Sequence, residues 1–134
     1  MQGAIRLIID GDPVPWKAHG GYGRRSFNPR WKEKEYFQHK IEEQYDGPLI
    51  SSAVSLDTIF YVSIPKSASK KKRELMLSGG IRPTKRPDAT NMRKFTEDCL
   101  NGTVLEDDSQ VVNGCLQKWY SETPRTEIIV VALV

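Results

Sequence analysis

Four segments of the chain have the hydrophobic pattern of β-strands. Each is short, rich in valine, isoleucine or aromatic residues, and flanked by turn-forming residues, which together predict a strand. The last segment is almost continuously apolar, so we expect it to be buried on both faces of a sheet. Gly114 interrupts the third segment and predicts a β-bulge there. The predicted strands cover residues 4–9, 54–64, 110–120 and 126–134.

Three other segments have helical patterns. Phe37, Ile41 and Tyr45 recur every four residues, which places them on one face of a helix. Asn28 stands before a proline at the start of that helix and is expected to be its N-terminal cap. Gly102 follows the third helix and suits a left-handed C-terminal cap. The predicted helices cover residues 30–45, 67–77 and 91–101.

The order of these elements, β-α-β-α-α-β-β, predicts an α+β fold with a mixed β-sheet flanked by helices. A chain of 134 residues has the ordinary size of one domain, so we expect residues 1–134 to form a single domain. Hydrophobic residues make up 38% and charged residues 28%, a composition that excludes a disordered chain.

Several absences bear on where the protein works. No apolar run approaches the ~18 residues of a membrane span, and the N-terminus lacks the pattern of a secretory signal. Cys99 and Cys115 do not have the spacing of a metal site and are expected to be free thiols in a reducing compartment. We therefore expect a cytoplasmic protein without a membrane partner.

The net charge of +3 conceals a strong asymmetry along the chain. Residues 1–65 are neutral overall, residues 66–94 have a net charge of +8, and residues 95–134 have a net charge of −5. A basic segment followed by an acidic one suits a phosphodiester enzyme, because cations attract the polyanion and carboxylates hold the metal that activates it. A solvated, charged surface loop explains the basic run equally well.

An aspartate precedes the third predicted helix. Asp88 lies where the helix macrodipole favours a carboxylate. At 100° per residue, Asn91, Lys94 and Asp98 form a polar stripe beside an apolar edge that can pack on the sheet. Ordinary roles explain these residues as well. Asp88 or Thr90 would serve as the N-terminal cap. Lys94 and Asp98 would form an i,i+4 pair worth ~0.3 kcal/mol.

Three consecutive acids, Glu106, Asp107 and Asp108, stand at the edge of the third predicted strand. Their charges repel one another unless a cation is present. Placed next to Asp88, they would supply the hard oxygen ligands that Mg²⁺ prefers. Alone, such a triplet is more often a solvated turn. It indicates a metal site only in combination with a basic segment and a helix that is preceded by an aspartate.

The combined pattern resembles the RusA-type crossover junction (Holliday junction) endodeoxyribonuclease family. That family has a basic-Pro-Asp stretch followed by x-Asp-Asn-Leu and x-x-Lys, then an acid and Leu-x-Gly, and finally Asp-Asp-x-Gln-Val. The resemblance is close over residues 82–130 and looser around residues 13–15 and 30–45. The matching segments here are RPDATNMRK at 86–94, DCLNG at 98–102 and DDSQV at 107–111.

The resemblance implies a Mg²⁺-dependent endonuclease, with Mn²⁺ able to substitute, that acts on four-way DNA junctions in recombination and repair. It makes Asp88 and Asp108 essential acids and metal ligands, and Asp107 an adjacent ligand or supporting acid. Lys94 corresponds to the essential lysine, which would stabilise charge on the phosphate or the leaving oxygen. Two symmetric cuts require two active sites related by a two-fold axis, which implies a homodimer. The residues expected to contact DNA are Lys70, Lys71, Lys72, Lys85, Arg86 and Asn91.

One residue departs from the family pattern. Better-known members carry a second essential aspartate where this chain has Thr90, so a neutral oxygen replaces a full negative charge. Thr90 can bind through its hydroxyl or through water, Asp107 or Asp98 can replace the missing ligand, or the site is weakened. Thr90 is also a good N-terminal cap, which is a structural reason for its presence.

Two other functions stay open at this point. The chain could be a non-catalytic protein that binds branched DNA and has lost turnover through Thr90. It could instead be a small structural or RNA-binding protein whose acids only balance charge. Three tryptophans, Trp16, Trp31 and Trp119, are expected in the core or at a dimer interface rather than as platforms for base stacking.

Overall fold

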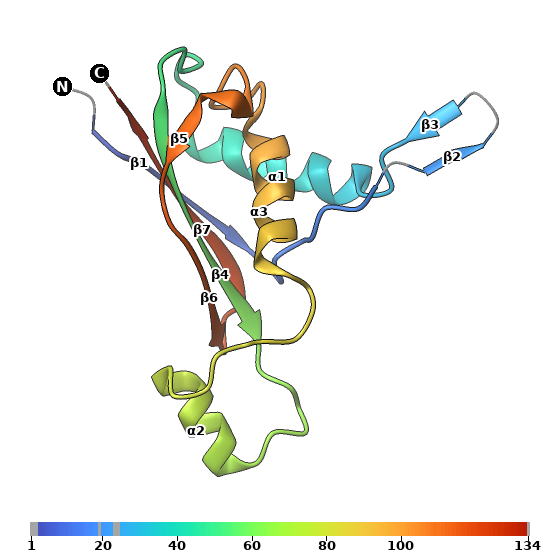
Figure 1. Ribbon diagram of the computed structural model, residues 1–134, viewed down its shortest axis with the longest axis vertical. Helices are drawn as coiled ribbons and strands as arrows, with labels where there is room; N and C mark the ends of the chain where they lie inside the picture. Colours follow the sequence, from blue (N-terminus) through green and yellow to red (C-terminus); the bar gives the residue numbers. More distant parts are fainter. Residues whose placement is uncertain (1–2, 19, 23–24, 134) are drawn as a thin grey trace.

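A computed structural model describes residues 3–18, 20–22 and 25–133, and this part of the chain forms one mixed sheet, three α-helices and a separate hairpin (Figure 1). The long elements follow the predicted order, so the α+β prediction is confirmed. The elements are β1 (Ile5–Asp10), β2 (Gly20–Tyr22), β3 (Arg25–Phe27), α1 (Trp31–Gln44), β4 (Val54–Ser63), α2 (Lys70–Ser78), α3 (Ala89–Leu100), the 3₁₀ turn η1 (Asp108–Gln110), β5 (Val111–Asn113), β6 (Leu116–Ser121) and β7 (Arg125–Ala132).

The sheet is mixed because β7 runs against its neighbours. Its order is β1-β7-β4, with β5 and β6 following one another along the outer side of β4. β7 is antiparallel to both β1 and β4, whereas β5 and β6 are parallel to β4. β4 and β7 are the central strands, which agrees with the long apolar runs in their sequences.

The predicted bulge is present and divides one expected strand into β5 and β6. The pairing of this strand with β4 shifts between Val54 and Ser55, and it resumes at Thr58 with Leu116 as partner. Gly114 has a φ of 133°, and a Cβ atom there would stand 1.8 Å from the carbonyl oxygen of Leu56. The backbones approach so closely that only glycine fits.

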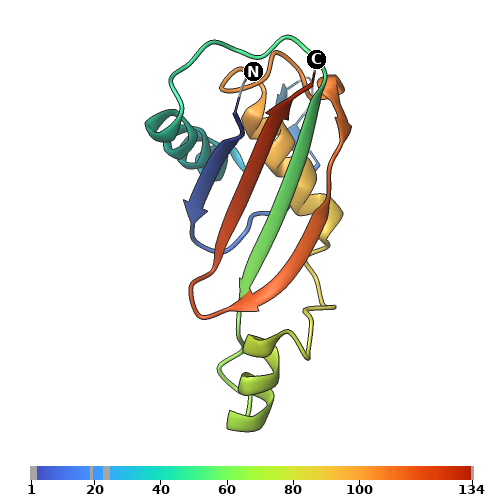
Figure 2. The same cartoon turned by 90° about the vertical axis from the view of Figure 1, so that its left-hand side faces the viewer.

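Both long helices cover the same face of the sheet. Figure 1 shows α1 and α3 on one side, and Figure 2, turned by 90°, shows the opposite face without a helix over it. Residues along β4 and β7 accordingly alternate between buried and partly exposed. The expectation that the last strand is buried on both faces is therefore wrong, because only one face has a helix layer to pack against.

The core lies between this face and the two helices. α3 contributes Met92, Phe95 and Cys99, which are all buried, so the apolar edge predicted for this helix is confirmed. Phe37 of α1 meets Phe95 edge to face, with the ring centroids 5.4 Å apart. Ile41 of α1 is also fully buried. α3 is therefore fixed along its length, and Arg93 adds polar contacts to the sheet by donating to Thr58 Oγ1 at 3.3 Å and to the carbonyl oxygen of Cys115 at 2.9 Å.

The helix ends differ from the predictions in two places. Asn28 does not cap α1; its side chain accepts a hydrogen bond from the N–H of Arg30 in a turn before the helix. α2 begins later than predicted, with Ser69 as the cap that accepts from the N–H of Lys72. Gly102 has a φ of 81°, as the predicted left-handed position after α3 requires.

α2 lies beyond the end of the sheet, at the same end where α3 begins (Figures 1 and 2). It follows the C-terminal end of β4, and the segment after α2 leads directly to the first turn of α3. The hairpin β2–β3 extends away from the sheet on the helix side (Figure 1). None of the helices in the described part of the chain is long and apolar enough to cross a membrane.

Candidate functional site

Three of the predicted site residues lie at the start of α3. Asp88 is the residue immediately before the helix, but its side chain makes no capping hydrogen bond. Asn91 and Lys94 follow on α3, and all three side chains are exposed. Thr90 is exposed inside the first turn and is not the N-terminal cap, so capping does not explain its presence. The exposed N–H groups of this turn favour negative charge, which suits a carboxylate or a phosphate.

Trp16 lies against the start of α3. The sequence prediction did not anticipate its contact with the candidate site. The ammonium group of Lys94 stands 3.5 Å from the centroid of the Trp16 ring, a close cation–π contact. The backbone N–H of Trp16 donates to the carbonyl oxygen of Asn91 at 2.9 Å. The loop after β1 is thus attached to α3 by a contact with Lys94 and a hydrogen bond to Asn91.

A cavity of about 370 Å³ opens at this turn. Its wall combines flat apolar surfaces with a cation, a carboxylate and an amide, which is a mixture suited to a nucleotide. The residues that line it are Pro15, Trp16, Arg86, Pro87, Asp88 and Asn91.

Lys118 of β6 fixes the segment that carries Asp88. Its ammonium group donates to the carbonyl oxygens of Lys85 at 2.6 Å and Pro87 at 2.7 Å. Burial lowers the pKa of Lys118, and the nearby charge of Asp88 acts in the opposite direction. A partly buried cation therefore lies beside Asp88 and adds to the positive potential at this end of the molecule.

The acidic residues of the second motif lie near the other end of α3. Asp107 and Gln110 form a capping box around η1, with Asp107 accepting from the N–H of Ser109 at 3.0 Å. These hydrogen bonds lower the pKa of Asp107. Asp108 is partly exposed, and its charge acts on Glu97 in the last turns of α3.

Glu97 reflects this acidic environment. Burial raises the pKa of Glu97, and the charges of Asp108 and Asp98 raise it further. Arg93 opposes the shift through a hydrogen bond of 3.3 Å to the Glu97 carboxylate. Asp98, the uncertain candidate of the sequence prediction, is thus half-buried on the acidic side of α3 rather than beside Asp88.

The structure does not bring Asp88 together with Asp107 and Asp108 within one chain. α3 separates them, and its 12 residues span ~18 Å at the rise of an α-helix. No group of three or more His, Cys, Asp or Glu side chains in the described residues is placed to hold a metal ion. The three carboxylates therefore do not surround one ion within a single chain, contrary to the prediction. The catalytic roles of Asp88, Lys94 and Asp108 stay predictions.

The basic residues gather at the Asp88 end. They lie on α2 and on the segment between α2 and α3, and all of them are exposed, as contact with DNA requires. The molecule thus has a basic end at the start of α3 and an acidic end where α3 stops. The exposed basic residues of the prediction are Lys70, Lys71, Lys72, Lys85 and Arg86.

The three tryptophans have different positions. Trp16 packs partly against the core and contacts the candidate site. Trp119 is half-buried beneath the guanidinium of Arg82, which stands 3.3 Å from its ring centroid. Trp31 is 55% exposed and is not a core residue. Its large exposed area is explained by its place at the first residue of α1, before the helix reaches the sheet.

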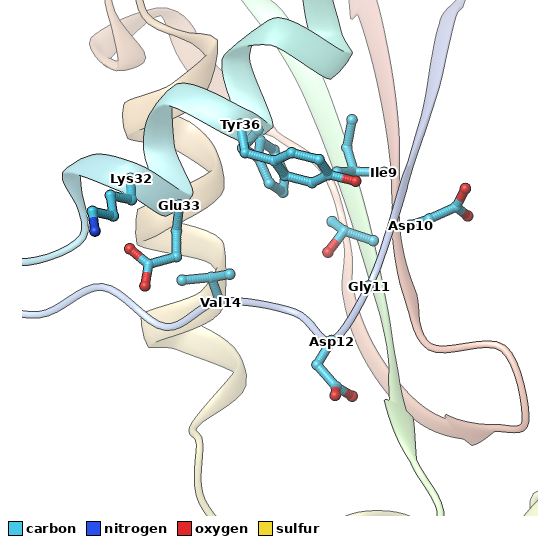
Figure 3. Close-up of a pocket in the computed structure, with 10 residues that line it drawn as sticks. Ile9, Asp10, Gly11, Asp12, Val14, Lys32, Glu33 and Tyr36 are labelled. Carbon is cyan, nitrogen blue, oxygen red and sulfur yellow. The ribbon is translucent and has the colours of Figure 1, made fainter.

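A second cavity, of about 350 Å³, lies between the end of β1 and the start of α1 (Figure 3). Carboxylates stand at its rim, but Figure 3 shows Asp10, Asp12 and Glu33 directed away from one another. Such a divergent set does not suit a metal ion, whose ligands must converge. None of the predicted site residues lines this cavity.

Residues 19–131 match the family model described as endodeoxyribonuclease RusA. The chain belongs to the RusA family of endodeoxyribonucleases. The match includes both motifs at the two ends of α3, so the resemblance found in residues 82–130 is confirmed at the level of the family. The RusA chain is also 43% identical over 95 residues to the uncharacterized protein YqaN of Bacillus subtilis (strain 168). That alignment covers 69% of this chain and 63% of the length of the relative.

Proposed function

We propose that this protein is an endonuclease that recognises four-way (Holliday) DNA junctions and hydrolyses phosphodiester bonds in them, in recombination and repair. The proposal is supported by the placement of Asp88, Asn91 and Lys94 along the start of α3, at the basic end of a chain that belongs to the RusA endodeoxyribonuclease family. A cation beside a carboxylate, in a region that attracts a polyanion, is the arrangement that phosphate chemistry requires.

The residues at the basic end have separate tasks in this proposal. The lysines of α2 with Lys85 and Arg86 bind phosphates around the branch point and hold the DNA against the first turn of α3. Lys94, held against Trp16, faces the scissile phosphate and stabilises the negative charge that develops on it. Asn91 orients a carboxylate or binds the DNA backbone.

A divalent cation belongs to the proposal, as Mg²⁺ or with Mn²⁺ in its place. Such an ion would supply Lewis-acid polarisation of the phosphate and a lower pKa for the attacking water. Asp88, Asp107 and Asp108 are the carboxylates proposed to hold it, and they have the hard oxygen donors that Mg²⁺ takes. Within one chain these donors lie at opposite ends of α3 and do not fit a single ion.

Two symmetric cuts across a junction support a homodimer, since a two-fold axis in the enzyme then matches the pseudo-symmetry of the substrate. A second function is supported by Thr90, which supplies a neutral hydroxyl where the family pattern has a carboxylate. In that case the chain binds branched DNA through its basic end but cleaves it slowly or not at all.

A synthetic four-way junction tests the proposal, with linear duplex of the same sequence as the control. We expect nicks in the junction that need Mg²⁺ or Mn²⁺ and that disappear in the Asp108→Asn variant. Tight, junction-selective binding without nicking would favour the non-catalytic function. In that case Thr90→Asp should restore cleavage if the missing carboxylate is the defect. Equal binding to junction and linear duplex, without nicks, would contradict both functions.

A further inference from the structure

The cavity between β1 and α1 has an apolar interior. Ile9 of β1 and Phe37 of α1 line it and are only 2% and 3% exposed. Val14, in the loop after β1, lines it as well and packs against the core. Figure 3 shows the Tyr36 ring reaching from α1 toward Ile9, so an aromatic face forms part of the wall. A volume of about 350 Å³ is near the lower limit of ligand pockets and leaves room for one large apolar group.

The loop that forms one wall of this cavity is anchored on both sides of Val14. Before it, the N–H of Gly11 donates to the carbonyl oxygen of Pro124 at 3.1 Å. After it, the N–H of Trp16 donates to the carbonyl oxygen of Asn91 at 2.9 Å. The cavity is therefore formed before any ligand arrives, and binding requires little ordering of the chain.

Charged side chains around the opening give the cavity an acidic rim. Among the described lining residues, three supply carboxylates and one supplies an ammonium group; they are Asp10, Asp12, Glu33 and Lys32. None of the ion pairs in the described part of the chain involves Asp10 or Asp12. Glu33 has only a distant partner, Arg30, at 3.9 Å. The rim therefore favours a cationic occupant.

Two kinds of ligand do not suit this cavity. The phosphates of a nucleic acid would be repelled by the acidic rim. A polar metabolite needs several polar groups that converge on it. Figure 3 instead shows the carboxylates of Asp10, Asp12 and Glu33 pointing in different directions. The apolar interior and the surrounding acids suit an apolar group with positive charge on more than one side.

We propose that this cavity is the docking site for a segment of a partner protein that inserts one aromatic or large aliphatic side chain and carries lysine or arginine beside it. The apolar side chain fills the interior next to Ile9 and Phe37, as anchor residues of protein interfaces do. The flanking cations lie near the rim carboxylates, which stand on different sides of the opening (Figure 3). The inference goes beyond the proposed nuclease activity, and its tests use no DNA.

The position of the cavity places this partner beside the basic end of the molecule. The hydroxyl of Ser63, the last residue of β4, donates to Asp12, so the cavity lies at the end of the sheet from which α2 follows. The same short loop carries Val14 at the cavity and Trp16 against Lys94. None of the residues expected to contact DNA lines the cavity.

A second copy of this chain is the competing occupant. Leu75 and Leu77 of α2 are 43% and 47% exposed and follow the basic residues at the start of that helix. We favour a separate protein, because docking of α2 would withdraw its lysines from the surface that the proposed function assigns to DNA. Sedimentation of the protein alone distinguishes the two. Self-association that Tyr36→Ala and Leu75→Lys both abolish would assign the cavity to a neighbouring α2 and overturn the proposal.

Short peptides test the chemistry of the site. The probe is Lys-Trp-Lys with blocked ends, and Glu-Trp-Glu and free indole are the controls for charge. We expect the probe to shift the NMR signals of Val14, Tyr36 and Thr126, and to bind about tenfold more tightly than either control. Equal binding of a control would overturn the proposal. So would shifts centred on the acidic residues 106–108, or no saturable shift up to the solubility limit of the probe.

Two exposed aromatic residues of α1 give a matched test of location. Tyr36 lines the cavity and is 49% exposed, whereas Trp31 is 55% exposed and does not line it. We expect Tyr36→Ala to weaken binding of Lys-Trp-Lys about tenfold and Trp31→Ala to leave it unchanged. Circular dichroism verifies that both variants are folded. Equal effects, or the opposite order, would place the peptide outside the cavity and overturn the proposal.

Neutral variants test the acidic rim. Asp10→Asn combined with Glu33→Gln should weaken binding of Lys-Trp-Lys several-fold and reduce its dependence on salt. Glu35→Gln combined with Glu42→Gln removes the same charge from exposed positions of α1 that do not line this cavity, and it should have little effect. If both double variants weaken binding equally, only the overall charge of the molecule is involved and the proposal fails.

Selection from a random peptide library extends the test to the sequence of the partner. The library is first depleted on the Tyr36→Ala variant and then selected on the wild-type protein. We expect the retained peptides to share an aromatic or large aliphatic residue next to lysine or arginine. Retained peptides without a basic residue, or a depleted library from which the wild type retains nothing, would overturn the proposal.

Discussion

At the scale of single residues, Trp16 positions Lys94 through a cation–π contact of 3.5 Å. The placement of Asn91 and Lys94 on one face of a helix that follows Asp88 was predictable from a local repeat of 100° per residue, and the structure has them in the first two turns of α3. Trp16 could not be found in this way. Trp16 and Lys94 are far apart in the sequence, and no local pattern indicates that they are in contact.

Replacement of Trp16 should release Lys94. The cation–π contact is worth about 0.5–1 kcal/mol at an exposed site, so we expect Trp16→Leu to lower junction cleavage several-fold with little change in junction binding. Trp16→Phe keeps an aromatic face and should retain most of the activity. The wild-type Lys94 side-chain protons should be shifted upfield in NMR spectra by the indole ring, and this shift should vanish in Trp16→Leu. Unshifted Lys94 protons in the wild type would contradict the contact.

The capping box of Asp107 should make the stability of η1 depend on pH. Hydrogen bonds from Ser109 lower the pKa of Asp107, so its stabilisation is complete above the unfolded value of about 3.9 and is lost as pH falls through the lowered pKa. We expect Asp107→Ala to be less stable than the wild type to urea at neutral pH. The two curves should converge in strong acid. A difference that stays constant with pH would show that the charge of Asp107 is not involved.

At the scale of elements, the long helices and strands were predictable because each carries its own period of apolar residues. The hairpin β2–β3 and the turn η1 were not, since three residues are too few to show a period. The position of Asp108 relative to Asp88 was not predictable either. Motif spacing suggests proximity, but a straight helix of 12 residues lies between them and holds them apart.

The junction between β5 and β6 should tolerate no side chain at Gly114. A Cβ atom there would meet the backbone of Leu56 at 1.8 Å, in addition to the strain of a positive φ. We expect Gly114→Ala to lower the free energy of unfolding by roughly 3 kcal/mol or more, as measured with urea. Gly102→Ala is the matched control, because φ is also positive there but nothing lies within 4 Å of the added atom. Its cost should be about 1–2 kcal/mol, the strain of a left-handed conformation alone. Equal effects of the two variants would mean that the strand is free to move away from Leu56.

At the scale of the whole molecule, charge is organised by the ends of α3 rather than by faces of the sheet. The sequence showed the basic and acidic blocks, and the family match assigns the chain to nucleases of DNA. The fold adds that α2 carries its lysines to the end of the sheet where the polyanion would approach the first turn of α3 (Figure 1). Composition alone does not indicate that the basic and acidic residues lie at opposite ends of α3.

The salt dependence of DNA binding should report on α2. Removing one lysine–phosphate interaction reduces the slope of log K against log salt concentration by about 0.9 for duplex DNA. We therefore expect the combined change of Lys70, Lys71 and Lys72 to Gln to flatten this slope by about 2 to 3, measured by fluorescence anisotropy on a labelled junction. Lys32→Gln with Lys40→Gln on α1 removes positive charge away from this end and should change the slope little. A similar slope change in both variants would indicate a diffuse charge effect.

The pairing of β1 with β7 has a practical consequence. Ile5 stands opposite Val130, so the first and last strands begin and finish as neighbours in the sheet. A short glycine–serine bridge between them would close the backbone into a ring without breaking any strand pairing. Fresh ends opened at the turn between β6 and β7 would then give a permuted protein with every buried contact retained, and with attachment points for surface immobilisation moved to the opposite end of the sheet.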